Sequence, residues 1–288
     1  MKKKIFCVLI TAVLLFSLFP LAVSADTGPK PSVRVNINGI DGEYYVTLLS
    51  YHPSNGPMSA WNGNESYAFY HEGDEGYDIW KKFVEYKDTD GYYFLQQFEK
   101  CEGEDEYSWT YYPPSPFKVL IYVPETDEFF VSGVYERYAF DSYFTLEAGK
   151  TGALLSLARS YDHGAEVLSL VARIVLTLIL EIGLAFAFGY TAKKQLLLIS
   201  AVNVFTQIVL NVLLNAVNFY SGHYAFVAYY VFLELIVLLI EAVIFYAFLH
   251  KFANKPKKRA LSVAYAASAN ALSFALGMVI AKMIPGIF

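Results

Sequence analysis

YAFVAYYVFLELIVLLIEAVIFYAFLH, residues 224–250, is an apolar stretch that carries two carboxylates in its interior. A helix that crosses a membrane needs about 20 apolar residues, and this stretch is longer than that. Glu234 and Glu241 lie two helical turns apart, so both side chains fall on one face of a helix. Because an ionised carboxylate in hydrocarbon costs at least about 2.5 kcal/mol, that face must meet protein or water. The stretch therefore predicts a polar site within a membrane helix.

Three further apolar stretches in the C-terminal half are long enough to cross a membrane. We predict four spans, at residues 167–190, 196–219, 224–250 and 260–284, within a transmembrane domain of residues 167–288. The composition agrees, since 56% of the chain is hydrophobic and only 17% is charged. The predicted fold class is a membrane protein in which an all-β, sandwich-like extracytoplasmic domain with one short helix precedes a four-helix transmembrane bundle.

Polar side chains recur at similar depth in all four predicted spans. In the second span, amide side chains repeat at four-residue spacing and form one stripe on the helix. In the fourth span, Asn270 lies on a face of small residues that suits close helix packing. The candidate polar site comprises Arg173, Glu181, Asn203, Gln207, Asn211, Glu234, Glu241 and Asn270.

Depth along the predicted helices divides these residues into two layers. The outer layer contains Arg173, Asn211 and Glu234, and the inner layer contains Glu181, Asn203, Glu241 and Asn270. We expect Arg173 to pair with Glu234, or else to extend toward the membrane surface. Glu181 and Glu241 then have no cationic partner, so the two would share a proton or hold a bound cation. The alternative for the amide stripe is packing between helices, at about 0.6 kcal/mol per contact.

The N-terminal half has a different character. Residues 1–25 combine three lysines, an apolar run and small residues at 23 and 25, which predicts a cleaved signal peptide. In residues 26–150, short alternating runs are separated by Gly, Pro, Asp and Asn, which predicts an antiparallel β-sandwich. The run DIWKKFVEYK at 78–87 has helical spacing and is predicted to cap an open end of the sandwich. Residues 151–166 are predicted to be a linker.

Charge predicts the orientation of the chain. The turns at 191–195 and 251–259 are rich in lysine, so the positive-inside rule makes both cytoplasmic in the plasma membrane. Residues 26–166 are then extracytoplasmic. This part of the chain is acidic, which argues against nucleic acid as a partner and suits a cationic ligand or divalent ions.

Sequence motifs for common enzymes are missing. The chain has no HExxH, GxSxG, P-loop or CxxC motif, and no cofactor or metal is predicted. The tetrapeptide DTDG at 88–91 resembles part of a calcium loop, but Tyr86 would take the first ligand position. A simple Asp-Gly turn is the favoured interpretation.

Several strings resemble one group of proteins. They are VNVFTQIVLN (202–211), ELIVLLIEAVIFY (234–246), YAASANALSFALG (265–277), SWTYYPP (108–114) and YERYAFDSYF (135–144). Together they are similar to an uncharacterised signal-peptide plus four-span membrane protein family of Gram-positive, clostridial-type bacteria. This resemblance covers nearly the whole mature chain and implies the architecture, but no known activity.

Three functions are compatible with this sequence. The first is a non-enzymatic membrane protein with a buried proton- or cation-responsive site, acting in transport or as a transport or envelope accessory. A four-span unit is small for a complete transporter, so this hypothesis implies a homo-oligomer or a partner membrane subunit. The second is a membrane-anchored sensor or ligand-binding module. The third is a membrane-embedded enzyme with Glu181 or Glu241 as general base on a lipid-linked substrate.

Overall fold

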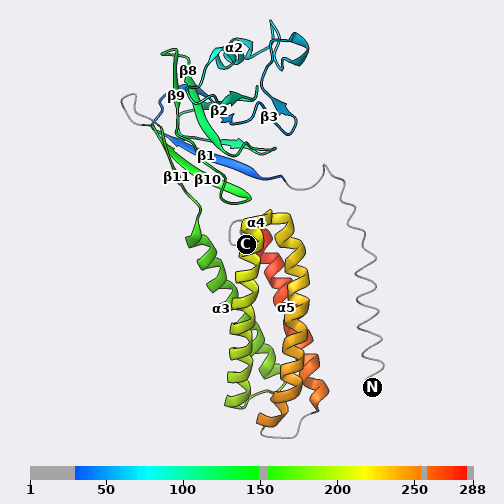
Figure 1. Cartoon of the computed structure of the whole chain (residues 1–288). Coiled ribbons are helices and arrows are strands. Elements are labelled where there is room, and N and C mark those ends of the chain that lie inside the picture. The colour runs from blue at the N-terminus through cyan, green and yellow to red at the C-terminus, as the bar shows by residue number, and fades with distance from the viewer. Residues whose placement is uncertain (1–29, 149–154, 254–257, 284–288) are drawn as a thin grey trace. The chain divides into compact units, whose positions relative to one another are not determined.

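A computed structural model describes residues 30–148, 155–253 and 258–283, in which a β-rich region is followed by long helices (Figure 1). The predicted signal peptide lies outside these residues, as do positions 151–154 of the predicted linker. The strands are β1 (Ser32–Asn38), β2 (Glu43–Ser50), β3 (Ser54–Asn55), β4 (Met58–Ser59), β5 (Tyr93–Phe94), β6 (Glu99–Glu102), β7 (Asp105–Trp109), β8 (Phe117–Val123), β9 (Glu128–Val131), β10 (Asp141–Glu147) and β11 (Ser156–Arg159). The helices are α2 (Tyr77–Glu85), α3 (His163–Ala187), α4 (Lys193–Phe248) and α5 (Arg259–Met283), with short 3₁₀ turns η1 (Glu65–Tyr67) and η2 (Leu249–Phe252).

Two main sheets build the β-rich region. One has the order β11-β10-β1-β7, the other has the order β5-β2-β8-β9 with β6 also paired to β2, and β3 and β4 form a small hairpin. β1 pairs with β10 in parallel, from Ser32 opposite Asp141 to Asn38 opposite Glu147. The prediction of a purely antiparallel sandwich is therefore wrong in this sheet. A tight turn forces an antiparallel pair, but these two strands lie at opposite ends of the domain sequence and are free of that constraint.

The core of this region lies between the two main sheets. Val33, Val35 and Ile37 of β1 point inward, as their alternation predicted, and are fully buried. They share one apolar cluster with Val119 and Ile121 of β8, in the other sheet. Cys101 on β6 belongs to the same cluster. Burial raises the pKa of its thiol to about 12, so Cys101 stays neutral and unreactive.

Helix α2 covers the outer face of the second sheet. Trp80 and Phe83 of the helix pack in a second apolar cluster with Leu120 and Tyr122 of β8. β8 is therefore buried on both faces, which explains why its sequence is almost continuously apolar. The helix predicted at 78–87 is present, but it covers a face of the sheet and not an open end.

One buried cation interrupts this apolar layer. Lys118 of β8 has its Nζ atom 2.9 Å from Oδ1 of Asp88 and 2.5 Å from Oδ2 of Asp90. Burial lowers the pKa of Lys118, but the hydrogen bonds to Asp90 and Asp88 outweigh it and leave the pKa above its usual value. Both acids belong to the predicted Asp-Gly turn, which the structure confirms, because the Gly91 amide donates to the Asp88 carbonyl at 3.2 Å. Lys118 thus fixes this turn against the sheet.

We expect Lys118→Met to destabilise the β-rich region by about 3–5 kcal/mol, because the buried carboxylate of Asp88 would lose its cation. All three tryptophans, Trp61, Trp80 and Trp109, lie in this region, so chemical unfolding of the full chain followed by tryptophan fluorescence reports on it. Lys100→Met is the matched control, since Lys100 forms only an exposed pair with Glu43. Equal stability of the two variants would contradict a structural role for the buried pair.

The helices correct the predicted four-helix transmembrane bundle, which is wrong. Among the described residues, two helical stretches are long and apolar enough to cross a membrane, Glu166–Ala187 and the 60-residue stretch Lys193–Phe252. The predicted spans at 196–219 and 224–250 both fall within the second stretch. The predicted span at 260–284 corresponds to α5, which is not one of these two stretches.

Helix α4 is not straight. Gly222 has φ +80° and ψ 175°, which lie outside the helical region. Glycine adopts such a positive φ more readily than other residues. Gly222 therefore divides α4 into two segments. Oε1 of Glu241 and Oγ1 of Thr206 are only 2.8 Å apart, whereas a straight helix would separate the two residues by about 50 Å. Near the two ends of α4, Nε2 of Gln195 donates to the carbonyl of Leu249 at 2.9 Å. The segments before and after Gly222 therefore pack side by side, next to α3 and α5 (Figure 1).

Candidate functional site

Helices α3, α4 and α5 bring five polar side chains together, which we call the carboxylate cluster: Glu181, Asn203, Thr206, Glu241 and Asn270. Glu181 comes from α3, Asn203 and Thr206 from the first segment of α4, Glu241 from the second segment, and Asn270 from α5. All five side chains are buried. The cluster contains the whole predicted inner layer.

Glu241 lies at the centre of this cluster and is 0% exposed. Its Oε1 atom accepts a hydrogen bond from the Thr206 hydroxyl at 2.8 Å. Its Oε2 atom accepts one from Nδ2 of Asn270 at 2.7 Å. Hydrogen bonds from donors to a carboxylate favour its charged form, so both oxygens of Glu241 are arranged for a negative charge.

Glu181 is equally buried, at 1% exposure, but it is less well satisfied. The side-chain amide of Asn203 lies within hydrogen-bonding reach of its carboxyl group, and the charge of Glu241 is close enough to act on it. Oε2 of Glu181 and Oδ1 of Asn203 are buried acceptors without a hydrogen-bond partner among the described residues. Such atoms are rare in folded proteins, and here two of them come from neighbouring side chains of the same cluster.

The backbone around Glu181 is held by α5. The hydroxyl of Tyr265 donates to the main-chain carbonyl of Glu181 at 3.0 Å. Tyr265 is fully buried and packs with Tyr190 and Phe245. This contact ties α3 to α5 at the depth of the carboxylate cluster.

In the predicted outer layer, aromatic side chains surround Arg173 and Glu234. The Arg173 guanidinium lies over the rings of Phe226 and Tyr230, with its Cζ atom 5.7 and 5.6 Å from their centroids. The Tyr230 hydroxyl lies within hydrogen-bonding reach of Glu234, and the charges of Arg173 and Glu234 act on one another. Arg173 is buried, so it does not extend toward the membrane surface. Aromatic side chains thus stand with Arg173 and Glu234 in this layer.

The remaining amides of the predicted stripe bond along their own helix. Nδ2 of Asn211 donates to the main-chain carbonyl of Gln207 at 2.8 Å, and both side chains are buried. Asn203 differs from these two residues, because it meets a carboxyl group from another helix.

Sequence reasoning missed Thr206, Tyr230 and Tyr265. Thr206 lies one turn after Asn203, and Tyr230 one turn before Glu234, so helical spacing from a known polar residue was the available signal. Tyr265 has no such signal in the sequence, because its partner is a backbone carbonyl on another helix.

A small apolar cavity adjoins the carboxylate cluster. It has a volume of about 190 Å³ and lies between the second segment of α4 and α5. Glu234 and Asn270 are the polar side chains that line it, among Val231, Leu235, Leu238, Ala267, Ala271 and Phe274. Because Asn270 also bonds Glu241, it connects this cavity to the cluster.

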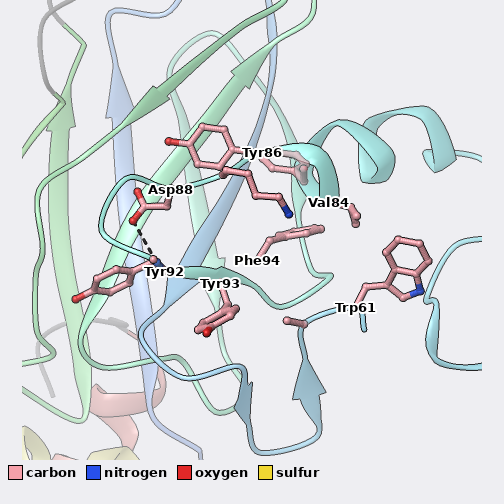
Figure 2. A pocket seen from close by; sticks show the side chains of 11 residues that line it. Trp61, Val84, Tyr86, Asp88, Tyr92, Tyr93 and Phe94 are labelled. Carbon is pink, nitrogen blue, oxygen red and sulfur yellow. Dashed lines mark hydrogen bonds between the residues drawn. The ribbon is translucent and has the colours of Figure 1, made fainter. Parts of the chain in front are cut away.

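A second cavity lies in the β-rich region and is lined by aromatic side chains (Figure 2). Its volume is about 240 Å³. In Figure 2, Phe94 lies between Trp61 on one side and Tyr92 and Tyr93 on the other. The Lys118 ammonium lies 5.0 Å from the centroid of the Tyr92 ring, and Asp88 accepts a hydrogen bond from the Tyr92 amide at 3.2 Å. The buried cation therefore also fixes one wall of this cavity.

Comparison with known proteins identifies no relative: no family model, no curated protein and no solved structure matches the chain. The described residues also contain no group of three or more His, Cys, Asp or Glu side chains that could hold a metal ion.

We expect Asn270→Ala to destabilise the helical part by about 1–3 kcal/mol, or more while Glu241 is charged, because Oε2 of Glu241 would lose its donor. Thermal unfolding of the purified full chain, followed by far-UV circular dichroism, measures this change. Ser268→Ala on the exposed face of α5 is the matched control. Two equal melting temperatures would show that the bond between Asn270 and Glu241 contributes nothing.

Proposed function

We propose that this chain is an integral membrane protein whose carboxylate cluster responds to protons or cations, and that it acts in transport or as a transport or envelope accessory. The observation that carries the proposal is the burial of Glu181 and Glu241 together. None of the ion pairs among the described residues involves either glutamate. Two uncompensated carboxylates are costly, and a site that only binds helices together does not need them.

The surface of the helices supports a membrane location. Large apolar side chains are exposed along α4, for example Leu197 at 70%, Phe205 at 68% and Val243 at 67%. A soluble protein rarely exposes so large an apolar surface, whereas lipid covers it without cost. The lipid bilayer is therefore the first partner that we propose. A second copy of the chain or another membrane subunit is the second, because the helical part is small for a transporter.

The orientation that we propose places residues 26–166 outside and the turns at 191–195 and 251–259 in the cytoplasm. It is supported by the hydrogen bond between Gln195 and Leu249, which brings the two ends of α4 together. Lys193, Lys194 and Lys251 are therefore located at the same end of the helices. Such a cluster of lysines is typical of the cytoplasmic side.

The test is ion movement in liposomes that contain the full chain. With a pH gradient or a Na⁺ gradient imposed in turn, we expect the wild type to move one of these ions. Both Glu181→Gln and Glu241→Gln should reduce this flux at least tenfold, because each removes an ionisable group of the cluster. Glu72→Gln, at an exposed position of the β-rich region, should leave the flux unchanged. Normal flux in both cluster variants would refute the proposal.

A second candidate function is a membrane-anchored extracytoplasmic sensor or ligand-binding module, and the aromatic cavity of Figure 2 favours it. Aromatic walls with polar groups at the opening suit sugar rings or peptide side chains. Because Trp61 lines the cavity, its fluorescence should change when N-acetylglucosamine oligomers or short peptides are added to the full chain. Trp61→Phe should remove the change, whereas Trp109→Phe, in the sandwich core, should not.

A further inference from the structure

We propose that the ligand of the carboxylate cluster is a single proton, which is bound to Oε2 of Glu181 and donated to Oδ1 of Asn203, while Glu241 stays ionised. This inference rests on the proposed function and names the ligand of the same site. The proton binds reversibly to the Glu181 carboxylate and converts it to a neutral carboxylic acid.

The side chains of Glu181 and Asn203 have more hydrogen-bond acceptors than donors. Asn203 uses its amide NH₂ group toward the Ile199 carbonyl, at 3.0 Å, and toward the Glu181 carboxyl group. Its own oxygen and Oε2 of Glu181 are both acceptors, and both lack a donor among the described residues. A proton on Oε2 turns one of these acceptors into a donor for the other. One proton thus allows a hydrogen bond from the Glu181 acid to the Asn203 oxygen, while the Asn203 amide stays within hydrogen-bonding reach of the carboxyl group.

In this proposal the negative charge lies on Glu241. Its two oxygens already accept hydrogen bonds from Thr206 and Asn270, so they need no proton. A carboxylate with two donors is stabilised in its charged form, whereas Oε2 of Glu181 meets no donor. The two glutamates are therefore not equivalent, although they are equally buried.

Other titratable groups also face Glu181 and Asn203. From α4 these are Glu241 and Glu234, and from α5 it is Tyr265. Both glutamates oppose a second negative charge at Glu181, and Tyr265 supplies its hydroxyl to the backbone and not to the carboxyl group. Arg173 packs on aromatic rings in the outer layer. Binding one proton changes the combined charge of Glu181 and Glu241 from −2 to −1, and burial favours the smaller charge.

The same count of donors and acceptors argues against calcium or magnesium. Calcium takes six to eight oxygen ligands, and magnesium requires near-octahedral geometry and keeps several waters. The described part of the cluster offers only two buried oxygens without a donor, and Glu241 already uses both of its oxygens. A proton needs one donor atom and one acceptor atom, which is what this pair provides.

The proton also controls contact between helices. When Glu181 is neutral, the acid and amide join α3 to the first segment of α4. When the proton leaves, Glu181 becomes a second carboxylate next to Glu241, and repulsion separates α3 from the second segment of α4. Proton binding at Glu181 would in this way change the packing of the helices, which is how the site couples a proton to movement.

Infrared difference spectroscopy of the full chain in lipid, recorded during pH titration, tests this assignment. The wild type should show one carboxylic acid C=O band from the helices that shifts on exchange into D₂O. Glu181→Gln should abolish this band, because glutamine replaces the acid while keeping its shape and its bond to Asn203. Glu241→Gln and Glu234→Gln should retain it. A band that survives in Glu181→Gln and disappears in Glu241→Gln would overturn the assignment.

A second variant keeps the test valid if Glu181→Gln does not fold. In Asn203→Ala the band of Glu181 should persist but move to higher frequency, because the acid loses its acceptor. An unchanged frequency would contradict the pairing with Asn203. Addition of Na⁺ at constant pH should leave the band in place. Loss of the band when Na⁺ is added would show that the ligand is a metal cation and not a proton.

The two proposals can fail separately. If the band belongs to Glu241 but both glutamine variants abolish flux, the proposed function stands and the proton assignment is wrong. If the band belongs to Glu181 and flux is unaffected in both variants, the proton is structural and the proposed function is wrong.

Discussion

The burial of two carboxyl groups among apolar helices is the constraint on which the rest of the helical structure depends. Neither Glu181 nor Glu241 reaches solvent, so each must be neutralised or solvated by neighbouring side chains. Thr206 and Asn270 come from different helices and supply hydrogen bonds to Glu241. The helices are therefore aligned by polar contacts at one depth, and apolar packing around Tyr265 and Phe245 holds them there. The chain turns back at Gly222, which allows one long apolar stretch to contribute two sides of this cluster.

The β-rich region also buries a charged side chain, but there the charge has partners of opposite sign. Its buried cation, Lys118, has two carboxylates within hydrogen-bonding distance and fixes a turn beside an aromatic cavity. The buried charge of that region is thus compensated, whereas no ion pair among the described residues involves the buried Glu181 or Glu241. This contrast is why we assign the ion-responsive role to the carboxylate cluster and a ligand-binding role, as the second candidate, to the aromatic cavity.

Helical spacing and depth along the helices predicted much of the carboxylate cluster. Spacing and depth assigned Glu181, Asn203, Glu241 and Asn270 to one layer, and the structure brings these four together; their function stays a prediction. The same arithmetic failed for the number of transmembrane helices, because two of the predicted spans belong to one continuous helical stretch that turns back at Gly222. It gave no sign of Phe226 and Tyr230, the aromatic neighbours of Arg173, because these contacts depend on how α3 packs against α4. Lys118 with Asp88 and the parallel pairing of β1 with β10 are long-range contacts, for which no local pattern exists.

The central claim is that Glu181 and Glu241 form one interacting pair, and a double-mutant cycle measures this most directly. The free energy of unfolding of the full chain would be determined for the wild type, Glu181→Gln, Glu241→Gln and the double variant at one pH. We predict that the two substitutions are not additive and differ from the sum by about 0.5–3 kcal/mol, as expected for side chains that share a network. Additivity within about 0.3–0.5 kcal/mol would show that the two glutamates do not interact, and would contradict the account.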